Sequence, residues 1–405
     1  MKLNKNSTKI LFATFSPWIK GVRLPTNGSL EPLREYFLPK VKTLVLIDQP
    51  IPGSDFVLPR NELYKNEKFE GIVPCAWYVS WLYGILWKNN TLGTRISFKI
   101  RDFLSVINMG FVFRPYDVFI GLESINAMAG IVLKKFGLVK RVVYYVSDYS
   151  PNRYSQGWFN SLYLWLDRFA CYHSDYIWDV STAMQPQRIK AGLKEGKSSP
   201  VIHVPNGLFE DQILSNSPKD TIANTIAYMG TLGKENGVDI LIQAMPLVLK
   251  KLPTAKLHII GGGKDDLERL KALTVKLKLD KQIIFYGFVQ KSADMARILG
   301  TARVAVIPYL AIPGSARWYA DANKIRAYAA ANLPIVTTHV PPLGQEAAKQ
   351  GAAIIVQDNS QEIAEAVIKV LTDEKVYSRM RKAAGKFAKN STWENTFNQA
   401  FSQMK

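Results

Sequence analysis

The sequence predicts an α/β protein made of two doubly wound domains, each a parallel sheet with helices on both faces. Short β-branched runs alternate with helical segments through the second half of the chain, and this rhythm is typical of βαβ units. A chain of 405 residues is too long for one ordinary core and suits two domains of about 200 residues each. The apolar content of 47% and the charged content of 21% indicate a folded globular protein.

The second half shows the alternation most clearly. We expect its strands at 225–232, 255–263, 283–289, 303–310, 335–338 and 352–357. After the first of these strands, apolar residues recur at helical spacing and share one face: Val238, Leu241, Ile242, Met245, Val248 and Leu249. This half therefore forms one doubly wound sheet, whose ligands bind beyond the carboxyl ends of the strands.

The first half shows the same rhythm less regularly, with strands expected at 9–15, 42–48, 117–122, 141–148, 175–181 and 201–205. A stretch rich in Pro, Ser, Asn and Asp follows and reads as a linker. We expect domains at 1–205 and 206–390. The last residues, 391–405, form a C-terminal helix for which a return to the first domain is one expectation.

The net charge of +19 is large, and basic residues are in excess in both halves. Such a charge favours anionic partners, namely nucleic acid, acidic lipid or phosphorylated substrates, although simple solubility is the plain alternative. No zinc-ligand cluster or RNA-binding aromatic signature is visible in the sequence, so we expect no nucleic-acid partner.

The two cysteines, Cys75 and Cys171, fit a reducing compartment, and the N-terminal apolar run ILFATF is short for a signal peptide. Both observations favour the cytoplasm.

Residues 74–88, PCAWYVSWLYGILWK, contain three tryptophans and two tyrosines. As a helix this segment spans about 22 Å, which is short of the roughly 30 Å of a bilayer core. Trp and Tyr favour the membrane interface, and basic residues flank the segment. Two interpretations stay open, a membrane-contacting element and an ordinary buried helix. The first predicts a protein bound peripherally to the inner face of the plasma membrane.

The stretch DANKIRAYAAANLPIV, 321–336, predicts a short helix that Asn323 caps and Leu333-Pro334 ends. Lys324 lies at its positive end, where a cation opposes the helix dipole unless an anion is near. This placement predicts an anion-binding site.

Three other loops end neighbouring strands of the same predicted sheet. The first, Gly230-Thr231-Leu232-Gly233-Lys234, allows backbone N–H groups to approach a phosphate, with Lys234 adding charge. Phe288 and Val289 end another strand and can face a flat ring, and Tyr309 ends a third. Taken singly, the glycines are also explained as turn formers and the aromatic residue as loop packing. Together with Lys324 they predict a diphosphate site.

The first half offers carboxylates at its strand ends. Asp148 follows the buried strand RVVYYV, where partial burial would raise the pKa of a general base. A helix cap or a turn residue is the structural alternative. Glu123 ends another strand and is a candidate for substrate contact, and Asn27-Gly28 form a candidate loop on the acceptor side.

These motifs, taken in order, resemble the donor domain of GT-B glycosyltransferases, above all family 4. The resemblance rests on YMGTL, NGVDILIQAM, LHIIGGG, IIFYGFV, ARVAVIPY and NKIRAYAAANLPIVTT, and on the interdomain segment HVPNGLFED. It covers residues 200–372 well and the first half loosely. The sequence departs from family 4 where that family usually carries an arginine, a lysine and two glutamates, because these positions hold Thr231, Asn236, Tyr319 and Ala327.

In layout the chain is more similar to the inverting, membrane-associated glucuronosyltransferase of xanthan assembly, family 70. That resemblance implies Lys324 and Tyr309 as ligands of a nucleotide diphosphate and Asp148 as the catalytic base. It implies transfer of a sugar, with an acidic sugar as one candidate, from a UDP-linked donor to a lipid-linked acceptor. It also implies an N-terminal acceptor domain and a C-terminal donor domain. The full expected donor set is Gly230, Thr231, Lys234, Phe288, Val289, Tyr309, Asn323, Lys324 and Tyr328.

We therefore expect a glycosyltransferase of polysaccharide or glycolipid assembly that uses no metal and no cofactor beyond its nucleotide-sugar substrate. Arg317 and Arg326, near Lys324, are candidates to meet a sugar carboxylate. The alternatives are a retaining family 4-like enzyme and a non-catalytic GT-B partner protein, the second being motivated by the missing glutamates.

Overall fold

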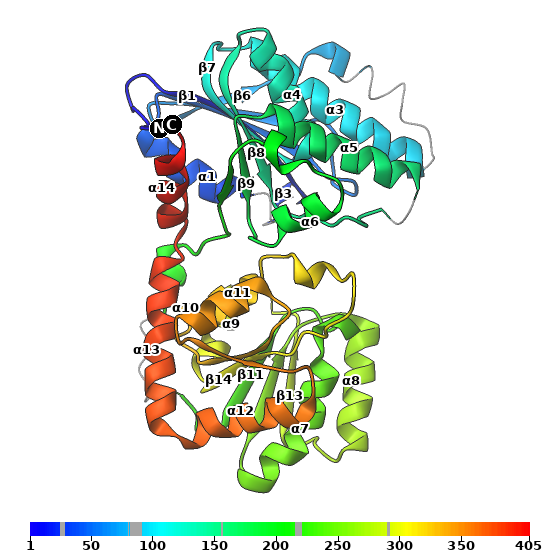
Figure 1. Ribbon diagram of the computed structural model, residues 1–405, viewed down its shortest axis with the longest axis vertical. Coiled ribbons are helices and arrows are strands. Elements are labelled where there is room, and N and C mark those ends of the chain that lie inside the picture. Colours follow the sequence, from blue (N-terminus) through cyan, green and yellow to red (C-terminus); the bar gives the residue numbers. More distant parts are fainter. Residues whose placement is uncertain (25–28, 80, 82–90, 155–156, 215–220, 290–291) are drawn as a thin grey trace. The chain divides into compact units, whose positions relative to one another are not determined.

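The computed structural model describes residues 1–405 except 25–28, 80, 82–90, 155–156, 215–220 and 290–291. The chain divides into two compact units, each with its own sheet (Figure 1). Unit 1 consists of Met1–Pro205 and Phe397–Lys405, and unit 2 of Asn206–Thr396. The α/β class with two Rossmann-like sheets, which the sequence predicts, is confirmed.

Unit 1 contains an eight-stranded sheet with the order β10-β9-β8-β7-β1-β4-β5-β6. Its first six strands in this order are parallel, and β5 and β6 add an antiparallel hairpin at one edge. Strand β4 is buried at every position, as expected for a parallel strand covered on both faces. The strands are β1 (Lys9–Ser16), β4 (Thr43–Pro50), β5 (Arg60–Lys65), β6 (Lys68–Val73), β7 (Tyr116–Leu122), β8 (Val139–Val146), β9 (Tyr176–Asp179) and β10 (Val201–His203), with a small hairpin of β2 (Trp18–Ile19) and β3 (Val22–Arg23).

The helices of unit 1 pack on this sheet, with α4 against β7 and β8 and between α3 and α5. They are α1 (Leu30–Phe37), α3 (Thr91–Phe111), α4 (Glu123–Lys135), α5 (Trp158–His173) and α6 (Met184–Lys190). The final helix, α14 (Trp393–Gln403), places Phe397 and Phe401 against Tyr36 of α1, with ring centroids 5.1 and 5.9 Å away. The last residues of the chain therefore complete the aromatic core of unit 1.

Unit 2 contains six parallel strands in the order β13-β12-β11-β14-β15-β16. This order reverses at β11, as in a dinucleotide-binding sheet, so the ends of β11 and β14 form the topological switch point. The strands are β11 (Thr225–Met229), β12 (Lys256–Ile260), β13 (Ile283–Gly287), β14 (Val304–Ile307), β15 (Ile335–Thr338) and β16 (Ala353–Val356).

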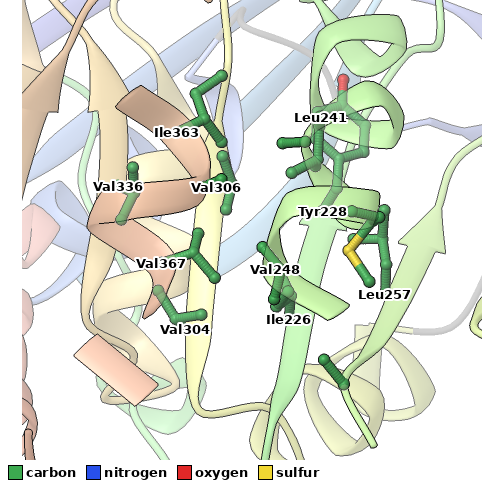
Figure 2. Packing of buried hydrophobic residues seen from close by; sticks show 14 of the residues in the cluster. Ile226, Tyr228, Leu241, Val248, Leu257, Val304, Val306, Val336, Ile363 and Val367 are labelled. Carbon is green, nitrogen blue, oxygen red and sulfur yellow. The ribbon is translucent and has the colours of Figure 1, made fainter. Parts of the chain in front are cut away.

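Helices cover both faces of the unit 2 sheet. On one face, Leu241 and Val248 of α7 and Ile363 and Val367 of α12 pack over the β-branched side chains of the central strands (Figure 2). On the other face, α10 contributes a stripe of buried alanines and Ile325. The helices are α7 (Val238–Lys251), α8 (Lys264–Lys276), α9 (Ser292–Gly300), α10 (Asn323–Ala330), α11 (Pro342–Lys349), α12 (Ser360–Thr372) and α13 (Glu374–Asn390).

The helix predicted in 321–336 is present as α10, but its predicted cap is wrong. Asn323 is the first helical residue, and Ala322, which precedes it, makes no capping bond through its side chain. The Asn323 side chain instead accepts a hydrogen bond of 3.4 Å from Arg326. The helix ends at Ala330, before the predicted stop at Leu333-Pro334, and Asn332 adopts a left-handed φ of 54°, which is common just after helix ends.

Candidate functional site

The carboxyl ends of β11 and β12 lie close to Lys324, the second residue of α10. Gly230, directly after β11, has a φ of 140°, and a Cβ atom there would lie 2.1 Å from Lys324 Cε. A Cβ atom on Gly261, directly after β12, would lie 2.0 Å from the carbonyl oxygen of Gly230. Both positions need glycine, because only the missing side chains allow the backbone and the lysine to approach so closely.

Lys324 holds its ammonium group among neutral partners. Its Nζ atom donates to the hydroxyl of Tyr228 at 3.0 Å and faces the Asn236 Oδ1 atom at 3.4 Å. It also lies 4.8 and 4.9 Å from the ring centroids of Tyr228 and Tyr309. Among the residues that the structure describes, no carboxylate forms an ion pair with it. Burial, and then repulsion from Arg317, lower the pKa of Lys324 to about 7.

A small network fixes the loop around this lysine. The Tyr228 hydroxyl donates to the Thr231 carbonyl oxygen at 2.6 Å. Buried Asn236 donates to Thr231 Oγ1 at 3.1 Å and to the Gly233 carbonyl oxygen at 3.2 Å. Tyr228 and Asn236 are absent from the donor set that the sequence predicts. Asn236 occupies a position where family 4 usually has a lysine. That difference was the one sign in the sequence that Asn236 could belong to the donor site.

Arg317 adds a second cation beside the same tyrosine. Its guanidinium carbon lies 5.3 Å from the Tyr309 ring centroid, and Tyr309 itself is buried. Burial raises the pKa of Tyr309, so its phenol stays neutral. Within the described part of the chain, Arg317 makes no ion pair with a carboxylate. Two half-buried cations at a topological switch point can therefore bind an anion that carries more than one negative charge.

Arg326, in contrast, is paired inside unit 2. Its Nη1 atom lies 2.7 Å from both carboxylate oxygens of Asp321, and both side chains are buried. The backbone and side-chain nitrogens of Asn206 donate to the same carboxylate at 2.8 and 2.9 Å. The segment PNG is thus tied to the start of α10. Arg326, which the sequence offered as a partner for a sugar carboxylate, is already occupied.

The other predicted donor residues divide into buried and exposed ones. Tyr328 is fully buried, and its hydroxyl accepts from the Met229 backbone at 2.7 Å. It would therefore influence a ligand by fixing the end of β11 and not by contact. Thr231 and Asn323 are exposed, as is Lys234 in a 3-10 turn, Lys234–Asn236.

Phe288 and Val289 follow β13. The Phe288 side chain is 81% exposed and lies next to Gly262, where a Cβ atom would come within 3.1 Å of the Phe288 Cβ. Val289 is half-buried against the core on the α10 side of the sheet. An exposed ring at the strand ends agrees with the predicted contact to a flat base, which stays a prediction.

Unit 1 brings Glu123 and Asp148 together through one arginine. The Arg153 Nη1 atom lies 3.8 Å from Glu123 Oε2 and 3.7 Å from Asp148 Oδ2, and it donates to the Asp148 carbonyl oxygen at 2.8 Å. Asp148 is only partly buried, because half of its side chain, 51%, is exposed. Glu123 is the less exposed of the two carboxylates, with 16% exposure. Asn27 and Gly28 lie outside the described residues.

Aromatic residues are exposed at the surface of unit 1. Trp77 and Trp81, in the described part of 74–88, are 75% and 57% exposed, and the remainder from 82 onward lies outside the described residues. On α5, Trp158 and Trp165 are also exposed. No described helix has the length and apolarity needed to cross a bilayer. The same residues contain no group of three or more His, Cys, Asp and Glu side chains arranged to hold a metal ion.

Two Rossmann-like sheets of this kind define the GT-B class of fold. Residues 223–373 match the family model described as Glycosyl transferases group 1. Among curated proteins, an uncharacterized glycosyltransferase of Methanocaldococcus jannaschii is 35% identical over 83 residues, which cover 20% of this chain and 20% of that protein. The chain thus matches about a fifth of the length of this relative.

Solved structures match over the whole chain. Sucrose-phosphate synthase of Thermosynechococcus elongatus superposes with a TM-score of 0.70 at 12% identity, covering 98% of each chain. Anabaena HepE, solved in complex with UDP and glucose, superposes with a TM-score of 0.64 at 15% identity, covering 98% of this chain and 99% of that one. At such identities the likeness establishes the fold, and the protein has the GT-B fold.

Proposed function

We propose that the protein is a glycosyltransferase that moves a sugar from a nucleotide diphosphate sugar to an acceptor hydroxyl. The observation that carries this proposal is Lys324, a half-buried cation without a carboxylate partner among the described residues, placed beside Arg317 at the switch point of the unit 2 sheet. The match of residues 223–373 to Glycosyl transferases group 1 supports the same reaction class. The anion that completes this site is the donor diphosphate.

The donor is UDP-linked in this proposal, because the HepE structure of the same fold contains UDP and glucose. Lys324, Tyr309 and the backbone of the Gly230 loop hold the diphosphate, and Phe288 covers the base. As the glycosidic bond breaks, negative charge grows on the diphosphate, and the two cations stabilise it. They supply the charge that a metal ion supplies in other transferases, so we propose a metal-independent reaction. Arg317 is the remaining candidate to meet an acidic sugar.

Inversion at the anomeric carbon requires a base on the acceptor side. The first-unit carboxylates, Glu123 and Asp148, supply it, and the sequence resemblance assigns the role to Asp148. The acceptor hydroxyl loses its proton to this cluster as its oxygen attacks the anomeric carbon.

The acceptor is membrane-associated and lipid-linked in this proposal, as in polysaccharide or glycolipid assembly. Support comes from the net charge of +19 and from exposed tryptophans in unit 1, Trp77, Trp81, Trp158 and Trp165. Tryptophan rings partition to the membrane interface, and basic residues are attracted to anionic lipid headgroups. The protein would then act on the inner face of the plasma membrane.

The test is a panel of UDP-sugars incubated with the purified protein and with lipid extracts as acceptor, with UDP release and labelled lipid product as readouts. We expect one donor to give a product of inverted anomeric configuration by NMR, and Asp148→Asn to retain UDP binding with reduced turnover. The control is Asp280→Asn, at an exposed position of unit 2. Absence of UDP binding by calorimetry would contradict the transferase proposal, and a retained anomeric configuration would favour the family 4-like alternative. Full turnover of Asp148→Asn would exclude Asp148 from the carboxylate cluster that acts on the acceptor.

A further inference from the structure

Glu123 occupies a strained turn between β7 and α4. Its φ is 66°, in the left-handed region that a glutamate rarely adopts, and it directly follows the last strand residue, Leu122. The same order of a strand, a strained residue and a helix occurs in α/β-hydrolases, in the turn that exposes the nucleophile above the sheet. Strain of this kind persists only where the surrounding structure enforces it.

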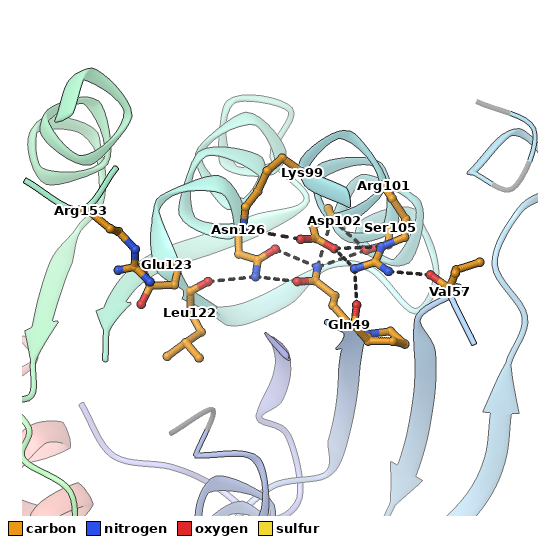
Figure 3. Close-up of polar contacts among 11 residues, drawn as sticks. Gln49, Val57, Lys99, Arg101, Asp102, Ser105, Leu122, Glu123, Asn126 and Arg153 are labelled. Carbon is orange, nitrogen blue, oxygen red and sulfur yellow. Dashed lines mark hydrogen bonds and ion pairs between the residues drawn. The ribbon is translucent and has the colours of Figure 1, made fainter. Parts of the chain in front are cut away.

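The surroundings of this turn enforce it from two sides. A Cβ atom on Gly121, two residues before Glu123, would lie 2.8 Å from the backbone of Asn126 and Ala127, so β7 and α4 meet at their closest possible approach. The Asn126 side chain donates to the Leu122 carbonyl oxygen at 2.9 Å and exchanges two hydrogen bonds with buried Gln49 of β4, as Figure 3 shows. The turn is therefore part of a rigid network.

This network presents the Glu123 carboxylate toward Arg153 (Figure 3). The Ser147 hydroxyl, at the end of the neighbouring strand β8, donates to Glu123 Oε1 at 2.9 Å. The charged groups that act on this carboxylate are Arg153 and Asp148, in the loop after β8, and Lys99 of α3. Burial, opposed by Arg153, raises the pKa of Glu123 above its ordinary value.

Asp148 differs in backbone geometry and in exposure. It has no positive φ and its side chain is half exposed, although its carboxylate faces the same Arg153, at 3.7 Å. An exposed carboxylate held beside an arginine serves well to orient that arginine. A buried carboxylate with a raised pKa is the better proton acceptor near neutral pH, because proton-transfer catalysis is most efficient when the pKa of the base lies near the working pH.

We propose that Glu123 is the base that takes the proton of the acceptor hydroxyl, and that Asp148 is a positioning residue that acts through Arg153. This assignment rests on the proposed transferase function. The acceptor O–H bond breaks and its proton passes to a Glu123 carboxylate oxygen, while the acceptor oxygen bonds to the anomeric carbon. The bond between that carbon and the diphosphate breaks, and its electron pair leaves on the diphosphate, balanced by Lys324.

The experiment compares two matched amide variants, Glu123→Gln and Asp148→Asn, in the full-length protein with its UDP-sugar and lipid acceptor. Loss of a general base costs about 10²- to 10⁴-fold in rate. We expect Glu123→Gln to lose this factor in kcat, to lose the rise of kcat with pH on the acidic side, and to keep UDP affinity. We expect Asp148→Asn to lose less and to keep that rise at a shifted pH.

A third variant separates catalysis from folding. Glu123→Gly relieves the left-handed backbone, so we expect a higher Tm together with lost transfer, and partial recovery of transfer by added formate, whose carboxylate replaces the missing side chain. Full activity of Glu123→Gln, an equal or larger loss in Asp148→Asn, or an unchanged pH profile in Glu123→Gln would overturn the assignment. Failure of the proposed function itself is distinguishable, because the wild-type protein would then bind no UDP and give no transfer.

Discussion

Glu123 in unit 1 and Lys324 in unit 2 are both shifted by burial toward their uncharged forms, and their charged forms have opposite sign. In unit 1, burial raises the pKa of Glu123. In unit 2, burial lowers the pKa of Lys324 to about 7. Both lie at the carboxyl ends of parallel strands, and both are fixed by backbone that approaches too closely for an added side chain, at Gly121 and Gly230.

Two buried arginines of the described chain are paired with carboxylates. Arg188 in unit 1 bonds Asp167 and Asp179 at 3.1 and 2.6 Å, and Arg326 in unit 2 bonds Asp321. Lys324 lies two residues from Arg326, yet its nearest partners are a phenol and an amide. The comparison indicates that buried charges paired with carboxylates stabilise the fold, whereas a buried charge without a carboxylate partner is a candidate to bind a ligand.

Arg326→Met tests the structural side of this comparison and has the largest expected effect. It leaves the buried Asp321 carboxylate with the nitrogens of Asn206 as its other recorded partners, and breaking a buried pair costs about 3–5 kcal/mol. Urea unfolding measures this loss. Arg297→Met, at an arginine with 76% exposure, is the control and should change the free energy of unfolding by under about 0.5 kcal/mol. A loss below about 1 kcal/mol in Arg326→Met would contradict the structural role.

Lys324→Met tests the functional side. Removing one preorganised group that stabilises growing charge costs about 10²- to 10³-fold in turnover, and no ion pair among the described residues is lost with Lys324. The folded pKa of Lys324 lies below its ordinary value of 10.5, so the unfolded chain binds more protons between about pH 7 and 10, and the lysine makes stability rise with pH in that window. We expect the variant to have a Tm at pH 7 equal to or above that of the wild-type protein, because the cost of burying a charge is removed, and to lose this rise.

Steady-state turnover and Tm against pH, with the exposed Lys276→Met as control, measure both expectations for Lys324→Met. Full turnover combined with lower stability would show that Lys324 holds the fold.

A comparison of the variants Gly230→Ala and Gly314→Ala tests whether the Gly230 loop belongs to the donor site. Both glycines have positive φ, 140° and 77°, but an added Cβ meets Lys324 at Gly230 and open space at Gly314. Both substitutions strain the backbone, and Gly230→Ala does so more, because a φ of 140° lies beyond the left-handed range that other residues can adopt. The Tm of each variant is therefore measured beside its UDP affinity, to separate backbone strain from displacement of the lysine. We expect about a tenfold weaker affinity for Gly230→Ala, measured by calorimetry. Equal affinities would remove the Gly230 loop from the donor site.

The strands of both sheets were largely predictable from the sequence, because β-branched runs such as those of β4 and β14 are buried on both faces. The hairpin of β5 and β6 was not predicted. Its segments are polar and short, and the reversal depends on positive φ at Asn66 and Glu67, residues without a glycine signal. No side chain of β6 is fully buried, so hydrophobic patterning gives no strand signal there.

The residues of the candidate site were predictable where they lie at neighbouring strand ends. They were not predictable where the burial of a side chain decides whether it can contact a ligand. Tyr309 could be predicted from its position after β14, and Lys324 from its position at the start of α10. The full burial of Tyr328 and the exposure of Asp148 depend on tertiary packing. The strained φ of Glu123 depends on the approach of α4 to Gly121, which no local pattern encodes.

The most direct test of the central claim is proton uptake on binding of UDP, measured by calorimetry at pH 8 in two buffers that differ in ionisation enthalpy. The second phosphate pKa of about 6 leaves the nucleotide fully ionised at this pH. Lys324, with a pKa of about 7, is mostly neutral in the free protein and becomes protonated beside the diphosphate. The account predicts uptake of about one proton by the wild-type protein and none by Lys324→Met. UDP binding without proton uptake, or no binding at all, would contradict it.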